Sequence, residues 1–108
     1  MRKVEIYTDG SSRGNPGPGG YGIVMQSGAL IKEFSEGFRK TTNNRMELLA
    51  VIEALNKLKL TNVQITVFSD SKYVVDSINE GWVYGWLKKG FKGKKNPDLW
   101  RLILPLLA

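Results

Sequence analysis

The chain contains no cysteine and no histidine among its 108 residues. These two absences exclude disulfides, thiolate nucleophiles, histidine general bases and the usual zinc ligands. No apolar run approaches the roughly eighteen residues that a membrane-spanning helix needs, and the segment 1–5 lacks the apolar stretch of a signal peptide. Any catalysis must therefore depend on carboxylates, hydroxyls, lysines or a hard metal bound through oxygen. We expect a cytoplasmic protein with no membrane partner.

The composition is that of one folded domain with a basic surface. Hydrophobic residues make up 42% of the chain, and 108 residues are enough for one modest core. We therefore expect a single domain over residues 1–108. The net charge is +6, and the segment 81–97 contains no acid but holds Lys88, Lys89, Lys92, Lys94 and Lys95. Such a segment suggests a polyanion partner, although a solvated loop kept soluble by lysines explains the same composition.

The first forty residues have the pattern of consecutive strands. Residues 4–9 alternate and are rich in β-branched and aromatic types, and residues 21–26 and 30–38 form two further candidate strands. Residues 10–20 are dense in glycine, proline, serine and asparagine, so we predict a loop there. A tight connection near residues 27–28 predicts an antiparallel meander.

The pattern then changes to a helical one. Apolar residues at helical spacing predict a helix over 44–60, and they are Leu48, Val51, Ile52, Leu55 and Leu58. Residues 63–68 are almost continuously apolar, as in a strand buried on both faces. A strand, a helix and a strand in succession predict a parallel crossover onto the first sheet. The fold class is therefore α/β, with a mixed sheet of three antiparallel strands and then a parallel strand, and with flanking helices.

The last third of the chain predicts short helices. We expect one over 71–79, capped from the segment that precedes it, and another over 81–87. Residues 90–96 should form an exposed loop, and Pro97 should open a last helix as a first-turn proline. Pro105 conflicts with the interior of that helix, because proline removes a backbone hydrogen bond and clashes with the preceding turn.

Three carboxylates fall at the ends of predicted elements, and each has an ordinary structural explanation. Asp9 precedes Gly10, and Asp-Gly is a common turn pair. Glu47 follows Asn44 by three residues, which is the spacing of a capping box at a helix start. Asp70 follows the fourth predicted strand, where it would cap the next helix. Considered singly, the structural explanation is the better one for each residue.

Their joint placement favours a metal site instead. The first and fourth strands should be neighbours, and ligands of open α/β sheets bind at the carboxyl ends of strands, where Asp9 and Asp70 lie. Glu47 lies next to the apolar stripe of the helix that packs on this sheet. Three converging acids would repel one another and raise the pKa of at least one of them. A divalent cation would balance them, and all-oxygen ligation favours Mg²⁺ or Mn²⁺ over zinc.

Four segments, in this order, resemble the successive signatures of the type 1 ribonuclease H family. They are residues 7–11, 14–22, 41–48 and 69–74, which read YTDGS, GNPGPGGYG, TTNNRMEL and SDSKYV. The segment 82–90 resembles the basic protrusion of bacterial members, and residues 98–100 resemble the helix after it. The likeness covers nearly all of the chain.

The resemblance implies a mixed five-stranded sheet with flanking helices, and endonucleolytic cleavage of the RNA strand of RNA–DNA hybrids with 5′-phosphate products. It implies a catalytic site formed by Asp9, Glu47 and Asp70, and a metal site formed by the same three residues and Gly10. Two Mg²⁺ ions, with Mn²⁺ as a substitute, are the implied cofactors. One ion would activate the attacking water, and the other would stabilise the leaving 3′ oxygen.

The resemblance also implies a set of nucleic-acid-binding residues. One group matches residues that contact minor-groove edges and ribose 2′-hydroxyls, and it consists of Asn15, Asn43 and Lys72. A second group matches a pocket for a DNA-strand phosphate, and it consists of Lys40, Thr42 and Asn96. The remaining members of the implied set are Asn44, Trp82, Trp86, Lys88 and Lys89, of which the tryptophans would pack on DNA sugars beside the lysines.

These assignments have structural alternatives. Asn15 could simply form an Asn-Pro turn, Asn43 could start a helix, and Lys72 could be a surface lysine. Trp82 and Trp86 could equally be core tryptophans that join two short helices. Since phosphate contacts add affinity without sequence specificity, we expect hybrid binding to weaken steeply as salt rises.

Members of this family extend further, with another strand, a histidine-bearing loop and a helix that carries a fourth active-site aspartate. We therefore expect a C-terminally truncated domain that lacks its last strand and helix. Its activity should be impaired, and the strand 63–68 should be an unpaired apolar edge. Two alternatives stay open. One is a non-catalytic remnant that binds hybrids or double-stranded RNA, and the other is a fragment that needs complementation or self-association, whereas a complete member should be a monomer.

Overall fold

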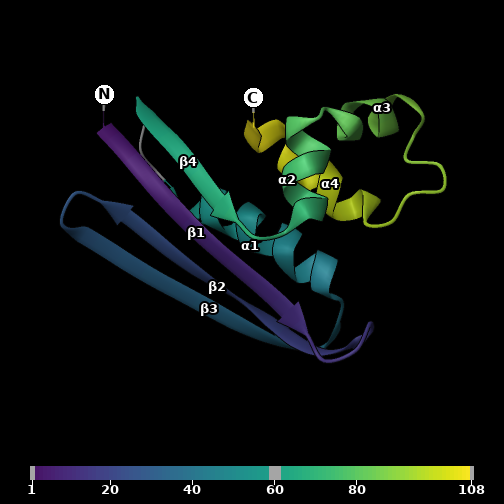
Figure 1. The fold of residues 1–108 in the computed structure, drawn as a ribbon, viewed down its shortest axis with the longest axis horizontal. Coiled ribbons are helices and arrows are strands. Elements are labelled where there is room, and N and C mark those ends of the chain that lie inside the picture. Colours follow the sequence, from purple (N-terminus) through teal and green to yellow (C-terminus); the bar gives the residue numbers. More distant parts are fainter. Residues whose placement is uncertain (1, 59–61, 108) are drawn as a thin grey trace.

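A four-stranded sheet in the order β3-β2-β1-β4 forms one layer of the structure (Figure 1). The computed structural model describes residues 2–58 and 62–107. The strands are β1 (Arg2–Ser12), β2 (Gly17–Ser27), β3 (Leu30–Thr41) and β4 (Val63–Ser69). The first three strands pair antiparallel and β4 pairs parallel to β1, with Thr8 opposite Ser69. The predicted α/β fold class, with its meander and parallel crossover, is confirmed.

The helices are α1 (Asn43–Lys57), α2 (Lys72–Asn79), α3 (Trp82–Lys88) and α4 (Pro97–Ile103), and a 3₁₀ turn, η1 (Leu104–Leu107), follows α4. In Figure 1, α1 lies behind the sheet, and the later helices lie beyond its β4 edge. None of the described helices is long and apolar enough to cross a membrane. Pro105 lies in η1 and not in α4, so the α-helix ends before the proline would break it.

The predicted loop over 10–20 is too long, because both flanking strands continue into it. β1 runs to Ser12 and β2 starts at Gly17, so only four residues remain for the turn. The glycines of this segment let the strands pair closely: a side chain at Gly19 would place its Cβ 2.5 Å from the carbonyl oxygen of Ser11. The glycine-rich composition here reflects close strand pairing as well as a turn.

The long helix also differs from its predicted bounds. α1 begins at Asn43 and ends at Lys57, and Leu58 has extended backbone angles. The predicted helix over 44–60 is therefore too long at Leu58, and its last two residues lie outside the described part of the chain. The other helices begin and end within a residue or two of the predictions.

Two apolar clusters share α1 as their common wall. One face of the helix packs on the sheet, where Ala50 and Ala54 meet Ile6 and Ile23. The neighbouring face packs on the later helices, and that cluster contains Leu48, Ile52, Val74, Val83, Trp100 and Ile103. Because α1 is held from two sides, its first turn has a fixed position relative to the carboxyl ends of β1 and β4.

The prediction that residues 63–68 are buried on both faces is wrong. Ile65 and Phe68 are 38% and 45% exposed, because β4 is the last strand of the described sheet and the helices cover only one face. On the open face Phe68 stacks on Tyr7, with ring centroids 4.8 Å apart. The expected exposed edge at this strand is therefore present in the described residues.

Candidate active site

Asp9 lies inside β1 and not in a turn. It pairs with Gly22 of β2, and Gly10 pairs with Tyr21, so the Asp-Gly pair is extended backbone within the antiparallel ladder. The turn explanation for Asp9 is therefore wrong. The side chain is exposed near the carboxyl end of the strand.

Asp70 follows β4 directly and lies beside Asp9. Thr8 and Ser69 are partners in the parallel ladder, so the next residue on each strand brings the two aspartates to neighbouring positions. The helix cap is Ser71, whose hydroxyl accepts a hydrogen bond from the backbone N–H of Val74 at 3.2 Å. The capping explanation for Asp70 is therefore wrong, which leaves its carboxylate without a structural role.

Glu47 also has no capping role. The N-cap of α1 is Thr42, whose hydroxyl accepts from the N–H of Arg45 at 3.2 Å, and Asn44 is already inside the helix. The predicted capping pair of Asn44 and Glu47 is wrong, because the helix starts two residues earlier than that pair requires. Glu47 is instead buried against the sheet, with a relative exposure of 7%.

Gly10 allows the helix to approach the strand at this point. A Cβ at Gly10 would lie 2.6 Å from the backbone nitrogen of Glu47 and 2.6 Å from the carbonyl carbon of Met46. Only a residue without a side chain permits this contact between the backbones of β1 and α1. The contact places Glu47 next to the residue that follows Asp9.

The charge environment of Glu47 includes both aspartates. Burial raises the pKa of the Glu47 carboxyl, a hydrogen bond from the Gly10 backbone partly offsets that rise, and the charges of Asp9 and Asp70 raise it further. One carboxylate oxygen, Oε1, is buried with no hydrogen-bond partner among the described residues. A buried anionic oxygen without a partner is costly unless a cation or a proton satisfies it.

This donor set fits a hard divalent cation. All the available ligand atoms are carboxylate or carbonyl oxygens, and three negative charges share one end of the sheet. Within residues 2–58 and 62–107 no three such side chains already enclose a common point. Asp9 and Asp70 are both exposed, so their carboxylates are accessible to a cation from solvent.

Glu47→Gln should raise the melting temperature of the metal-free chain at pH 7, since the neutral amide removes a buried charge beside two aspartates. The raised pKa means that the folded chain holds this proton more tightly than the unfolded chain does. The contribution of Glu47 to stability is therefore most favourable below its ordinary pKa and is lost as the pH rises through the raised value. The advantage of glutamine should shrink on acidification to about pH 4. Each kcal/mol gained in the free energy of unfolding should raise the melting temperature by about 4–8 °C.

Thermal unfolding in the presence of a chelator, at both pH values, checks this prediction. Glu80→Gln is the matched control, because Glu80 is exposed at the end of α2. A Glu47→Gln variant that melts at or below the parent temperature at pH 7 would show that Glu47 is not a destabilising buried charge.

Asn15 and Asn43 are brought together at the turn between β1 and β2. The backbone N–H of Asn43 donates to Oδ1 of Asn15 at 2.9 Å, and the backbone N–H of Ser12 donates to Oδ1 of Asn43. The hydroxyl of Ser12 joins both asparagines. Sequence reasoning missed Ser12, and its position at the end of a strand before a glycine-rich turn was the available signal.

The residues predicted to bind a DNA-strand phosphate are only partly brought together. The Thr42 hydroxyl is used as the helix cap, and Oδ1 of Asn96 accepts from the Arg45 guanidinium at 3.1 Å. Lys40 is exposed at the end of β3, and no hydrogen bond of the described residues joins it to Thr42 or Asn96.

Arg45 is a residue that the sequence reasoning missed. It forms a two-pronged ion pair with Asp98, with N–O distances of 2.7 and 3.1 Å, and this pair holds the pKa of the Asp98 carboxyl below its usual value. The side-chain amide nitrogen of Asn96 donates to the Tyr73 hydroxyl. That hydroxyl also accepts a hydrogen bond from the Trp100 indole N–H at 2.9 Å. These contacts connect the starts of α1, α2 and α4 close to the carboxylates.

The two tryptophans of α3 have different environments. Trp82 is 51% exposed, so it is not a core residue. Trp86 is half-buried and makes a T-shaped contact with Trp100, and the Lys94 ammonium lies 5.1 Å from the Trp86 ring centroid. Both tryptophans line a hollow of about 340 Å³ together with Asn44. The core explanation is therefore wrong for Trp82 and correct in part for Trp86.

The basic residues of this region are on the surface. Lys88 and Lys89 are exposed at the end of α3, and Lys72 is exposed at the start of α2. Lys89 lines a second hollow with Trp82 and Trp86. Lys89 and the exposed Trp82 ring thus share one part of the surface.

Several known proteins are similar to this chain over nearly its whole length. A family model described as RNase H matches residues 1–107. A ribonuclease H of Syntrophus aciditrophicus is 50% identical over 113 residues, and the match covers 100% of this chain and 65% of that protein. The chain thus spans about two thirds of the length of that curated relative.

Two solved structures are similar to the whole chain or most of it. The crystal structure of LC9-RNase H1, a type 1 RNase H with the type 2 active-site motif, has a TM-score of 0.84 and 32% identity, covering 100% of this chain and 59% of that chain. LC11-RNase H1 in complex with an RNA/DNA hybrid has a TM-score of 0.66 and 37% identity, covering 71% of this chain and 61% of that chain. Together with the match over residues 1–107, these likenesses show that the chain belongs to the RNase H family.

Proposed function

We propose that the chain functions as a metal-dependent endonuclease that hydrolyses the RNA strand of RNA–DNA hybrids and leaves 5′ phosphates. The observation that carries this proposal is the buried Glu47 carboxylate. Its Oε1 atom has no partner among the described residues, and its pKa is raised by burial and by both aspartates. Membership of the RNase H family supports the substrate class.

Asp9, Glu47 and Asp70 would hold the divalent ions, with the Gly10 carbonyl as a further oxygen donor. When bound, Mg²⁺ or Mn²⁺ would activate the attacking water and stabilise the leaving 3′ oxygen. The ladder between β1 and β4 fixes the spacing of the two aspartates, and the contact at Gly10 fixes the height of Glu47 above them. The burial of Glu47 keeps water from one side of this carboxylate, which strengthens its interaction with a cation.

The face beside this site would bind the hybrid. Asn15 and Asn43 present amide groups at the turn next to β1, where they can read ribose hydroxyls. Trp82 and Lys88 of α3, with Lys89 at the C-cap of this helix, would contact the DNA strand. The LC11-RNase H1 relative was solved with an RNA/DNA hybrid, which supports this partner for the present chain.

Trp82→Ala should weaken hybrid binding by roughly fivefold, because loss of an aromatic contact costs ~1 kcal/mol. The change should leave the fold intact, since Trp82 is half exposed. Fluorescence anisotropy of a labelled hybrid in Ca²⁺, over a series of salt concentrations, measures both the affinity and its salt slope. Tyr84→Ala is the control, because Tyr84 is also exposed on α3 but does not line the hollows beside Trp82. Equal affinities for the two variants would contradict the assignment of Trp82.

A cleavage assay tests the proposed activity. The chain is incubated with an RNA–DNA hybrid labelled on the RNA, with Mg²⁺ or with chelator, beside the same sequence as duplex DNA. We expect metal-dependent cuts within the RNA only. A second arm adds, as a separate peptide, the portion of the Syntrophus relative that lies outside the match, so that a folded but incomplete site is distinguished from a wrong assignment. Tight hybrid binding without cleavage in either arm would instead identify a binding module.

A further inference from the structure

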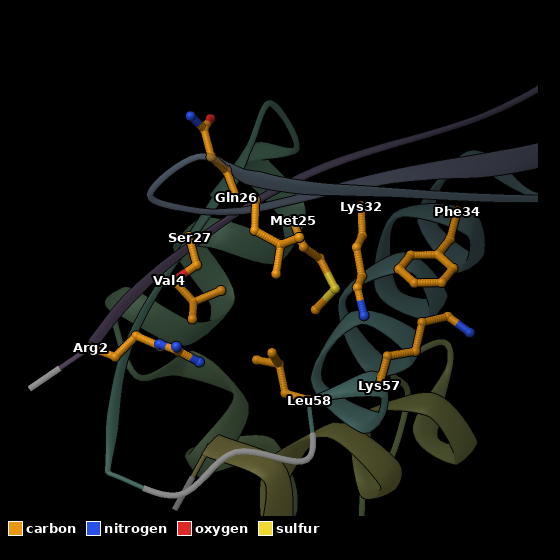
Figure 2. Close-up of a pocket in the computed structure, with 10 residues that line it drawn as sticks. Arg2, Val4, Met25, Gln26, Ser27, Lys32, Phe34, Lys57 and Leu58 are labelled. Carbon is orange, nitrogen blue, oxygen red and sulfur yellow. The ribbon is translucent and has the colours of Figure 1, made fainter.

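A cavity with an apolar floor and a cationic rim lies at the far end of the sheet from the carboxylates. It encloses about 300 Å³ and is formed by the start of β1, the end of β2, the start of β3 and the end of α1 (Figure 2). Its lining includes Arg2, and Asp9 lies seven residues further along the same strand. At a strand rise of about 3.3 Å per residue, the cavity is about 23 Å from the carboxylates.

The floor of this cavity is apolar. Val4, Met25, Phe34 and Leu58 line it, and Figure 2 shows Val4, Met25 and Leu58 directed toward the open centre. Val4 and Met25 are almost completely buried members of the sheet cluster, so the floor belongs to the folded core and is already formed. A preformed apolar concavity of this volume is at the small end of ordinary ligand pockets.

The rim of the cavity is cationic. Arg2, Lys32 and Lys57 line it, and no aspartate or glutamate of the described residues does. The Lys57 ammonium lies 4.6 Å from the Phe34 ring centroid, which holds its aliphatic stem along the wall. Within residues 2–58 and 62–107, none of these three cations is in an ion pair. Positive charges around a low-dielectric hollow focus their field on it and attract an anion.

We propose that this cavity binds a small amphiphile with one anionic head group and an unbranched apolar body, such as a medium-chain carboxylate. The apolar body would occupy the space over Val4, Met25 and Leu58, and the head group would lie beside Lys32 and Lys57, on the side of the cavity opposite Arg2. Neither part suffices alone, because the floor offers no polar partner to an inorganic anion and the rim repels cationic amphiphiles. The distance from the carboxylates makes this site independent of the proposed cleavage chemistry.

Isothermal titration calorimetry of the chain with decanoate, below the micellar concentration, tests the proposal. We expect saturable binding of one molecule per chain, and no binding of decylamine or inorganic phosphate. Binding should also raise the melting temperature, because the ligand favours the folded chain. Amide shifts in NMR spectra should be confined to residues of the cavity wall such as Met25 and Phe34 and should leave Asp9 unchanged.

Two variants make the test specific. Lys32→Met combined with Lys57→Met should weaken decanoate binding at least about tenfold, and both lysines are exposed, so the variant should fold. Lys3→Met is the matched control, since Lys3 is an exposed cation of β1 that does not line the cavity. Equal binding of decylamine, unchanged affinity in the double variant, or displacement of decanoate by an RNA–DNA hybrid would overturn the proposal. Binding to phosphatidylglycerol vesicles without binding of monomeric decanoate would also overturn it, because the cations would then serve a membrane surface.

Discussion

Asp9→Asn is expected to reduce magnesium-dependent cleavage of the RNA strand by at least about a hundredfold. The amide keeps the shape of the side chain and the pairing of Asp9 with Gly22, so the sheet should be unchanged. It removes one of the charges that converge on Glu47. Charge stabilisation through a bound divalent ion is worth several kcal/mol, and each 1.36 kcal/mol corresponds to a factor of ten in rate. Gel analysis of end-labelled RNA under single-turnover conditions gives the rate.

Asp76→Asn provides the comparison for this variant. Asp76 is on α2, outside the group of acids that raises the pKa of Glu47, and it carries the same charge. Its replacement should leave the cleavage rate within about twofold, because surface substitutions away from special features have small effects. If Asp9→Asn cleaves as fast as Asp76→Asn, the carboxylates of β1 and β4 do not carry the chemistry.

Gly10→Ala should disable the site without changing any ionisable group. The new Cβ would lie 2.6 Å from the Glu47 nitrogen and from the Met46 carbonyl carbon, both of which are backbone atoms held by the helix. α1 must therefore move away from β1. We expect a loss of about 1–3 kcal/mol in the free energy of unfolding. Cleavage should fall by about a hundredfold, since a displacement of about 1 Å is enough to misalign a catalytic group.

Gly37→Ala separates this contact from a general effect of alanine in a strand. Gly37 is in β3, and a Cβ there would meet only the Gly19 carbonyl oxygen, at an ordinary 3.8 Å. Denaturant unfolding and the cleavage rate should both stay close to the parent values in this variant. A Gly10→Ala chain that is as stable and active as Gly37→Ala would show that the close approach of α1 to β1 is unnecessary.

The sheet and the long helix were predictable because their signals are strongly periodic. The apolar residues of α1, such as Leu48 and Ile52, repeat at helical spacing and are buried in the structure. The crossover from β3 through α1 to β4, which lies parallel to β1, followed from the order of elements alone. The exact strand ends at Ser12 and Gly17 were not predictable, because glycine favours a turn locally and is compatible with close strand pairing in context.

The carboxylates could be recognised from the sequence, but their local explanations could be excluded only in the structure. Asp9, Glu47 and Asp70 each had a plausible turn or capping role. Those roles disappear because Thr42 and Ser71 are the caps and the Asp-Gly pair is inside a strand. Cap positions differ by one or two residues between equally reasonable assignments, so sequence patterns do not resolve them.

The contacts that join distant segments were not visible in the sequence. The ion pair between Arg45 and Asp98 connects residues 53 positions apart, and the bond from Trp100 to Tyr73 spans 27. Nothing in the local pattern of either segment indicates its partner. The burial of β4 was also overestimated, because an apolar run does not tell which of its faces the helices will cover.

A titration of the metal-free chain with Mn²⁺ tests most directly whether three carboxylates converge on a cation site. Electron paramagnetic resonance reports the free ion, and Mg²⁺ serves as the competitor. We expect saturable binding that Mg²⁺ displaces and that weakens at least about tenfold in each of Asp9→Asn, Glu47→Gln and Asp70→Asn, while Asp76→Asn retains the parent affinity. Equal Mn²⁺ binding by the parent and the three site variants would contradict the account, because the buried Glu47 carboxylate would then have no cation to satisfy it.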